Sequence, residues 1–149
     1  MPAPSALELT TAVVAAADAL LRESQRLFRP HGLTAAQFNV LNVLAGRPAG
    51  LSQRELGDLL VVDRSNVTGL LDRMGEAGWV RRSDDAADRR IYRVTLTPAG
   101  RRLWSAVEPR YRAVAGQVAG GLAAAQRAQC LAALRHMEAA AARWTLPGA

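Results

Sequence analysis

The sequence predicts a mainly α-helical fold that carries one small β-hairpin. Apolar residues recur with helical spacing over most of the 149 residues, whereas the stretch before residue 97 alternates as a strand does. Half of the residues are hydrophobic, and no linker-like segment interrupts the chain. One domain covering residues 1–149, built on one substantial core, is therefore expected.

A long first helix is expected over residues 5–28. Val13, Leu20 and Leu27 recur every seven residues there, each with an apolar neighbour, and so form a continuous apolar stripe. The stripe could face the core of a single chain or a second copy of it. Both explanations fit the sequence equally well.

Two capping boxes mark the starts of the next helices. Thr34 with Gln37 opens a short buried helix over residues 34–45, and Ser52 with Glu55 opens another helix after a glycine-containing turn. The apolar side of this second helix is expected to consist of Leu56, Leu59 and Leu60.

The helix that follows, which Asp63 could cap, has one apolar and one polar face. Its buried side is expected to be Val67, Leu70, Leu71 and Met74, at the spacing i, i+3, i+4 and i+7. The outward side carries small or hydrogen-bonding residues, which suit close approach to base edges in a major groove: Ser65, Asn66, Thr68, Gly69 and Arg73. Glycine within a helix costs about 1 kcal/mol relative to alanine, so Gly69 indicates either close backbone approach or a neutral surface position.

A charged turn followed by an alternating strand predicts the hairpin. Residues 79–83 and 91–96 are the expected strands, and the polar segment 84–90 is the hairpin tip. Thr97-Pro98 then predicts a helix start, because the threonine hydroxyl can accept a free backbone N–H and proline is tolerated in the first turn. Two long helices, over about 98–117 and 122–143, are separated by Gly120-Gly121.

The run DRRIYRVTLTPAG, residues 88–100, resembles the signature of the MarR family of winged helix-turn-helix regulators. The matching positions are Asp88, Arg90, Val94, Leu96, Thr97 and Gly100. The resemblance implies a winged helix-turn-helix over about 34–97, dimerisation helices over about 1–30 and 98–149, and a homodimer that binds double-stranded DNA. It also implies a small-molecule effector bound between the dimer helices and the winged domain, for which His31, Trp104 and Tyr111 are candidates. Trp and Tyr at helical spacing are more often core residues, and a lone histidine is more often a capping or surface residue.

The same resemblance assigns roles within the wing and around the reading helix. Arg90 matches the arginine that enters the minor groove, Arg89 either touches phosphate or faces solvent, and Asp88 would orient the wing through a salt bridge or a turn hydrogen bond. Arg81 and Arg82 are weaker candidates, since consecutive strand residues point to opposite faces. Three further residues are expected to hold the DNA backbone: Gln53, Arg54 and Arg64.

Charge and composition limit the other functions. The net charge is +6, and the largest basic surplus, nine arginines against five acids, lies between residues 64 and 102. Cys130 is the single cysteine, expected to be buried, so neither an intramolecular disulfide nor a cysteine metal cluster can form within the chain. No cofactor, metal site, catalytic constellation, signal peptide or membrane span is expected, which favours a cytoplasmic bacterial protein and argues against an enzyme.

The sequence therefore predicts a dimeric repressor that binds a pseudo-palindromic operator and is released by a small aromatic or anionic ligand. An activator of the same fold is the alternative, because the position of the operator decides the sign of regulation. A winged-helix module for protein contact or RNA binding is a further alternative. RNA is disfavoured because no exposed aromatic platform is evident on the outward side of residues 65–73.

Overall fold

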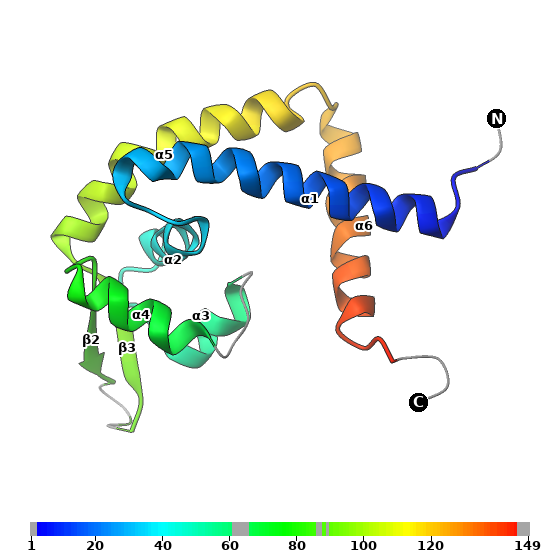
Figure 1. Cartoon of the computed structure of the whole chain (residues 1–149). Helices are drawn as coiled ribbons and strands as arrows, with labels where there is room; N and C mark the ends of the chain where they lie inside the picture. The colour runs from blue at the N-terminus through cyan, green and yellow to red at the C-terminus, as the bar shows by residue number, and fades with distance from the viewer. Residues whose placement is uncertain (1–2, 61–65, 86–87, 89, 146–149) are drawn as a thin grey trace. The chain divides into compact units, whose positions relative to one another are not determined.

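The computed structural model describes residues 3–60, 66–85, 88 and 90–145 and confirms the predicted fold class. In chain order the elements are α1 (Ala6–Phe28), η1 (Arg29–His31), α2 (Ala35–Ala45), β1 (Leu51–Ser52), α3 (Gln53–Leu59), α4 (Val67–Glu76), β2 (Val80–Asp84), β3 (Tyr92–Leu96), α5 (Pro98–Ala119) and α6 (Ala124–Ala141) (Figure 1). They form two compact units, residues 1–111 and 112–149, with the boundary inside α5.

The predicted capping boxes are present at the starts of α2 and α3. The hydroxyl of Thr34 accepts from the N–H of Gln37 at 3.2 Å, and the side chain of Gln37 accepts from the N–H of Thr34 at 2.9 Å. Ser52 and Glu55 make the same reciprocal pair at 3.2 and 2.7 Å. These local hydrogen bonds satisfy backbone donors that a helix start leaves free.

The core of the first unit gathers apolar side chains from α2, α3, α4 and the hairpin around the C-terminal end of α1. The four residues predicted for the buried side of α4 are all buried, whereas Leu59 of α3 is 46% exposed, so its assignment to the apolar face was wrong. Phe28 and Phe38 stack with ring centroids 4.5 Å apart, and the Tyr111 ring lies 4.9 Å from that of Phe38.

The sheet has three antiparallel strands in the order β1-β3-β2. The predicted hairpin is β2 with β3, and it extends away from the helices of its unit (Figure 1). Strand β1 was not predicted; its Leu51 pairs with Val94 of β3. Gly50, directly before it, has a φ of +74°, and a Cβ there would lie 2.6 Å from the carbonyl oxygen of Val94, so glycine is required by both conformation and space.

Thr97 joins the hairpin to α5, as its sequence position predicted. Its hydroxyl accepts from the N–H of Gly100 at 3.0 Å and donates to the carbonyl of Gly78 at 2.5 Å, while its own N–H donates to the carbonyl of Trp79 at 3.0 Å. One side chain therefore caps α5 and binds the segment between α4 and β2.

Replacing Thr97 with valine is expected to lower the free energy of unfolding by about 1–2 kcal/mol, because the cap and the bond to Gly78 are lost together. Urea denaturation measures the change. Thr95→Val is the matched control; its hydroxyl only accepts a 3.3 Å bond from Arg81, so we expect a change within about 0.5 kcal/mol. Equal losses in the two variants would contradict the capping role.

Much of the predicted helical stripe is uncovered in this single chain. On α1, Leu20 and Leu21 are 45% and 60% exposed, and the buried end of the helix is Phe28. Within the first unit, α1 is buried only at its C-terminal end. No residue of α6 is buried, and Cys130 is exposed, so its predicted burial was wrong for the isolated chain.

The described residues also lack the features of two other kinds of site. Within them, no helix is long and apolar enough to cross a membrane. The same part of the chain contains no group of three or more His, Cys, Asp or Glu side chains that could hold a metal ion.

Candidate nucleic-acid interface

The outward face of α4 carries the polar residues predicted for it. Thr68 and Arg73 are exposed and Gly69 is half-buried, opposite the four buried apolar residues. Asn66 is exposed but is the N-cap residue of α4, and its side chain makes no capping hydrogen bond. A Cβ on Gly69 would lie 3.5 Å from Nη1 of Arg73, so the Arg73 guanidinium lies over the glycine. Ser65 and Arg64, together with Asp63, lie outside the described residues.

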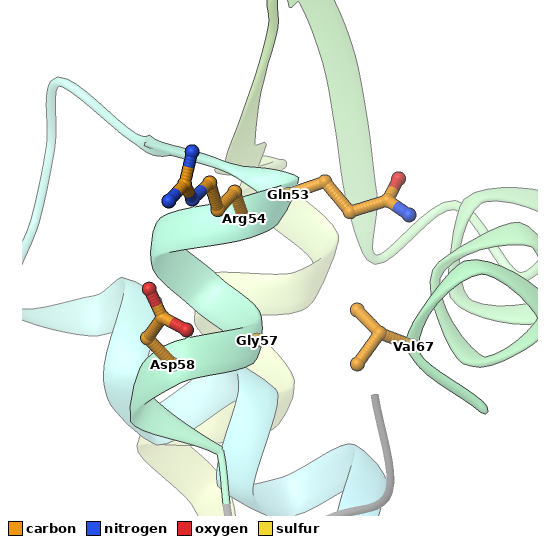
Figure 2. A pocket seen from close by; sticks show the side chains of 5 residues that line it. All are labelled: Gln53, Arg54, Gly57, Asp58 and Val67. Atoms are coloured by element: carbon orange, nitrogen blue, oxygen red, sulfur yellow. The ribbon is translucent and has the colours of Figure 1, made fainter. Parts of the chain in front are cut away.

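Gln53 connects α3 to this face. Its Nε2 donates to the Thr68 hydroxyl at 2.6 Å, which leaves the hydroxyl proton of Thr68 available to an acceptor outside the protein. Figure 2 shows Gln53 and Arg54 leaving the start of α3 in different directions, with Gln53 extending toward the helix that carries Val67. The structure therefore places Gln53 beside Thr68 on the exposed face of α4, and leaves Arg54 exposed on the rim of the groove between the two helices.

Arg82 ties the hairpin to α4. Its Nη1 donates to Oδ1 of Asp72 at 2.7 Å. Arg81 instead donates from Nε to the Thr95 hydroxyl of the neighbouring strand at 3.3 Å. Because Asp72 compensates the charge of Arg82, this guanidinium is a weaker phosphate donor than an arginine without an acid beside it.

The predicted wing residues lie on the turn between β2 and β3. The Arg90 side chain is exposed, and its backbone N–H donates to Oδ1 of Asp88 at 2.9 Å. Asp88 was expected to orient the wing through either a salt bridge or a turn hydrogen bond, and this contact is the turn hydrogen bond. Arg89 lies outside the described residues.

Arg93 and Asp85 form an ion pair that the sequence reasoning missed. The Arg93 Nε lies 2.6 Å from Oδ2 of Asp85, and the hydrogen bond raises the pKa of the guanidinium further above its usual value. The Arg93–Asp85 pair could be found from sequence only once the strand register is known, since Arg93 is opposite Ser83, two residues before Asp85.

At the start of α3, hydrogen bonds from the backbone and side chain of Ser52 hold the pKa of Glu55 below its usual value.

The three candidate effector residues have different surroundings. Tyr111 packs against Phe28 and Phe38, and the Trp104 Nε1 donates to Oδ1 of Asn42 at 3.1 Å, so both take part in the packing of the first unit. The Nε2 of His31 is buried and has no hydrogen-bond partner among the described residues. An unpaired buried nitrogen is costly unless another group satisfies it.

A helix that begins with a capping box, a following helix with a polar face, and a hairpin with an exposed arginine together define a winged helix-turn-helix, the fold of a class of DNA-binding proteins. A family model described as "MarR family" matches residues 31–91. The Escherichia coli transcriptional regulator HosA is 32% identical over 105 residues, which cover 70% of this chain and 77% of HosA. The chain belongs to the MarR family.

Two other similar proteins extend the comparison. The transcriptional activatory protein BadR of Rhodopseudomonas palustris is 39% identical over 108 residues. The matched segment covers 70% of this chain but only 61% of BadR. The solved structure of BpsR from Bordetella bronchiseptica has a TM-score of 0.74 and 30% identity, covering 87% of this chain and 98% of BpsR; its description concerns regulation of DNA binding by 6-hydroxynicotinic acid. The fold and these relatives are those of transcriptional regulators, not of enzymes.

Proposed function

We propose that this chain binds double-stranded DNA sequence-specifically and regulates transcription. The observation that carries the proposal is the exposed face of α4, where Thr68 and Arg73 lie opposite a fully buried apolar side and Gln53 is bonded to Thr68. In the bound state α4 enters the major groove with these residues and Asn66, and Arg90 enters the adjacent minor groove. Gly69 has no side chain of its own, so close approach of the helix requires only that the Arg73 guanidinium lying over it moves to the DNA.

The remaining predicted contacts keep their roles in this proposal. Arg54 holds the DNA backbone from the start of α3, and Asp88 supports the wing through its bond to the Arg90 N–H. Three further contacts are proposed from sequence alone: Ser65 on the reading helix, Arg64 on the backbone and Arg89 on the wing.

The functional unit is a homodimer. Exposed apolar residues on α1 support this: Leu7, Val14 and Leu21, seven residues apart, form one row, and Leu9 and Leu20 lie on another side of the helix. A monomeric protein rarely leaves such a row exposed. On α6, Leu131 and Leu134 are 49% and 46% exposed. Two reading helices about 34–36 Å apart would match a pseudo-palindromic operator.

A glutamate at Leu21 is expected to shift the protein toward monomer and to weaken operator binding at least about tenfold, because a charge would be buried in the apolar contact. Sedimentation velocity and gel shift measure the two effects. Ala15→Glu adds the same charge at the heptad position shared with Glu8 and Arg22, about 120° around α1 from Leu21, and should leave the oligomeric state and operator binding unchanged. A Leu21→Glu protein that remains a dimer would show that this face does not form the interface.

The signal is a small aromatic or anionic ligand that releases the DNA. Support comes from the description of BpsR, which names 6-hydroxynicotinic acid, and from the buried Nε2 of His31, which has no hydrogen-bond partner in the described part of the chain. A panel of aromatic carboxylic acids, titrated against the protein–DNA complex, tests this. Release by one of them supports the proposal, and retention of DNA with all of them argues against this ligand class.

Repression is the regulatory mode that we propose, by competition with RNA polymerase at a promoter. Activation is a second candidate, because BadR, 39% identical over the matched segment, is named an activatory protein. Selection of bound genomic fragments at moderate salt, followed by transcription in vitro from the recovered promoters, decides between them. Recovery of no enriched sequence would overturn the proposal of specific binding.

Arg73→Ala is expected to change the preference among operator variants, with a loss of about 1–3 kcal/mol at the base pair it contacts. Binding to a set of single-substitution duplexes at fixed salt measures the change. A loss of equal size on every duplex would instead make Arg73 a phosphate contact. Asn66→Ala provides a second test of the same face.

A further inference from the structure

Arg93 lies at the centre of the hydrogen bonding that holds the wing. It is on β3, the central strand of the sheet, where it pairs in register with Ser52 of β1 on one side and with Ser83 of β2 on the other. Its Nε lies 2.6 Å from Oδ2 of Asp85, whose side chain is only 11% exposed. The carboxylate of the ion pair is therefore largely shielded from solvent, so dissolved salt screens the attraction between the two charges less than it would in a fully exposed pair.

Asp85 in turn forms the base of the turn that presents Arg90. Its Oδ1 accepts from the N–H of Asp88 at 3.2 Å, and its own N–H donates to the carbonyl of Ile91 at 2.9 Å. Asp88 then accepts from the N–H of Arg90 at 2.9 Å. A continuous chain of hydrogen bonds thus leads from the Arg93 guanidinium to the backbone of Arg90.

The other end of the same guanidinium reaches the start of α3. Nη1 of Arg93 donates to the carbonyl of Gly50 at 3.2 Å and lies 3.8 Å from Oε2 of Glu55. That carboxylate also closes the capping box with Ser52. One side chain therefore connects the turn of the hairpin to the helix that carries Gln53, the partner of Thr68 on the reading face.

We propose that Arg93 and Asp85 are positioning residues, which fix the turn that carries Arg90 relative to the helix-turn-helix and so determine operator affinity without touching DNA. This inference rests on the proposed function, in which Arg90 contacts the operator. The charge of Arg93 is already compensated by Asp85 and lies close to Glu55, which makes it a poor phosphate donor. The exposed guanidinium of Arg90 is the group that the network presents.

Asp85→Asn separates a positioning role from a simple effect of charge, because the two predict opposite changes in the affinity for the operator. Removing an acid near DNA raises the local positive charge, which by itself strengthens binding. Loss of the ion pair instead releases the turn and weakens specific binding. We expect affinity to fall about tenfold for a duplex selected by the wild-type protein from a randomised pool, and to stay equal or rise for an unselected duplex of the same length.

Asp84→Asn is the matched control. Asp84 is an exposed acid one residue earlier, at the end of β2, so its removal changes the net charge equally. We expect equal or tighter binding of both duplexes. A loss in Asp84→Asn as large as that in Asp85→Asn would overturn the specific role of the Arg93–Asp85 pair.

A double-mutant cycle with Arg90→Ala completes the test. If Asp85 acts through Arg90, Asp85→Asn should lower the affinity for the selected duplex by less than about twofold when Arg90 is already alanine. Equal losses in both backgrounds would overturn the inference while leaving DNA binding by the wing intact. Unchanged binding by Arg90→Ala alone would instead overturn the wing contact in the proposed function.

Arg93→Lys provides an independent variant with the charge kept. A lysine cannot reproduce the separate contacts of Nε and Nη1, so we expect weaker binding of the selected duplex without a change in the slope of affinity against salt. Thermal unfolding of each variant confirms that the comparison is made between folded proteins. Wild-type affinity in Arg93→Lys would mean that the charge alone is sufficient, as in a phosphate contact, and would overturn the positioning role.

Discussion

Gly100→Ala is expected to lower the free energy of unfolding by about 1–3 kcal/mol or more, a large part of the stability of a small domain. A Cβ at this position would overlap the carbonyl oxygen of Trp79 and lie 2.9 Å from its carbonyl carbon. That carbonyl accepts the N–H of Thr97, so it cannot move without breaking the bond between the residue before β2 and the junction of β3 with α5. The overlap is with backbone, which a change of side-chain rotamer cannot relieve.

Chemical denaturation of the purified protein measures this effect, and Gly75→Ala is its control. Gly75 also lies in a helix, but a Cβ there meets nothing within 4 Å. Alanine at Gly75 should therefore stabilise the protein by about 0.5–1 kcal/mol through the better helix propensity. Stabilisation of Gly100→Ala by the same amount would show that the contact between the start of α5 and Trp79 is looser than the structure indicates.

Local patterns predicted the helices because the interactions that start and bury them are local. The boxes at Thr34 and Ser52 involve residues three positions apart, and the buried side of α4 follows from its periodicity alone. Strand β1 could not be predicted in this way, since two residues form it only by pairing with β3, some forty positions later. The exposure of Cys130 was missed for a related reason: apolar neighbours in sequence do not reveal that α6 has no buried residue within its own chain.

The candidate site shows the same division between local and long-range information. The signature predicted Arg90 and Asp88, and helical periodicity predicted Thr68 and Arg73. The contacts that join these parts depend on tertiary structure. The Asp72–Arg82 ion pair and the Arg93–Asp85 pair each cross between elements, so neither has a spacing that a sequence pattern could identify.

Arg90→Ala is expected to leave the dimer and the fold intact and to cost about 1–3 kcal/mol of DNA affinity per half-site. A dimer with two wings would then lose about 2–6 kcal/mol, roughly 30-fold to 10⁴-fold in affinity. The reason is that the guanidinium is exposed at the turn, while its backbone is held by Asp88, so truncation removes the proposed contact to DNA and leaves the hydrogen bond to Asp88 in place. Gel shift at matched salt measures the loss.

Arg81→Ala controls for the loss of one positive charge from the same hairpin. Its Nε donates to the Thr95 hydroxyl, so we expect a smaller loss of affinity, similar on all duplexes.

The groove that Arg90 is proposed to enter can be tested with base analogues. An inosine–cytosine pair lacks the guanine amino group and so resembles A·T in the minor groove, whereas G·C places a donor there. If the contact is through the minor groove, the wild-type protein should keep its affinity when an A·T pair beneath the wing is replaced by I·C and lose affinity when it is replaced by G·C. The Arg90→Ala protein should bind these two substituted duplexes equally well. If both proteins discriminate equally, another group reads this part of the operator.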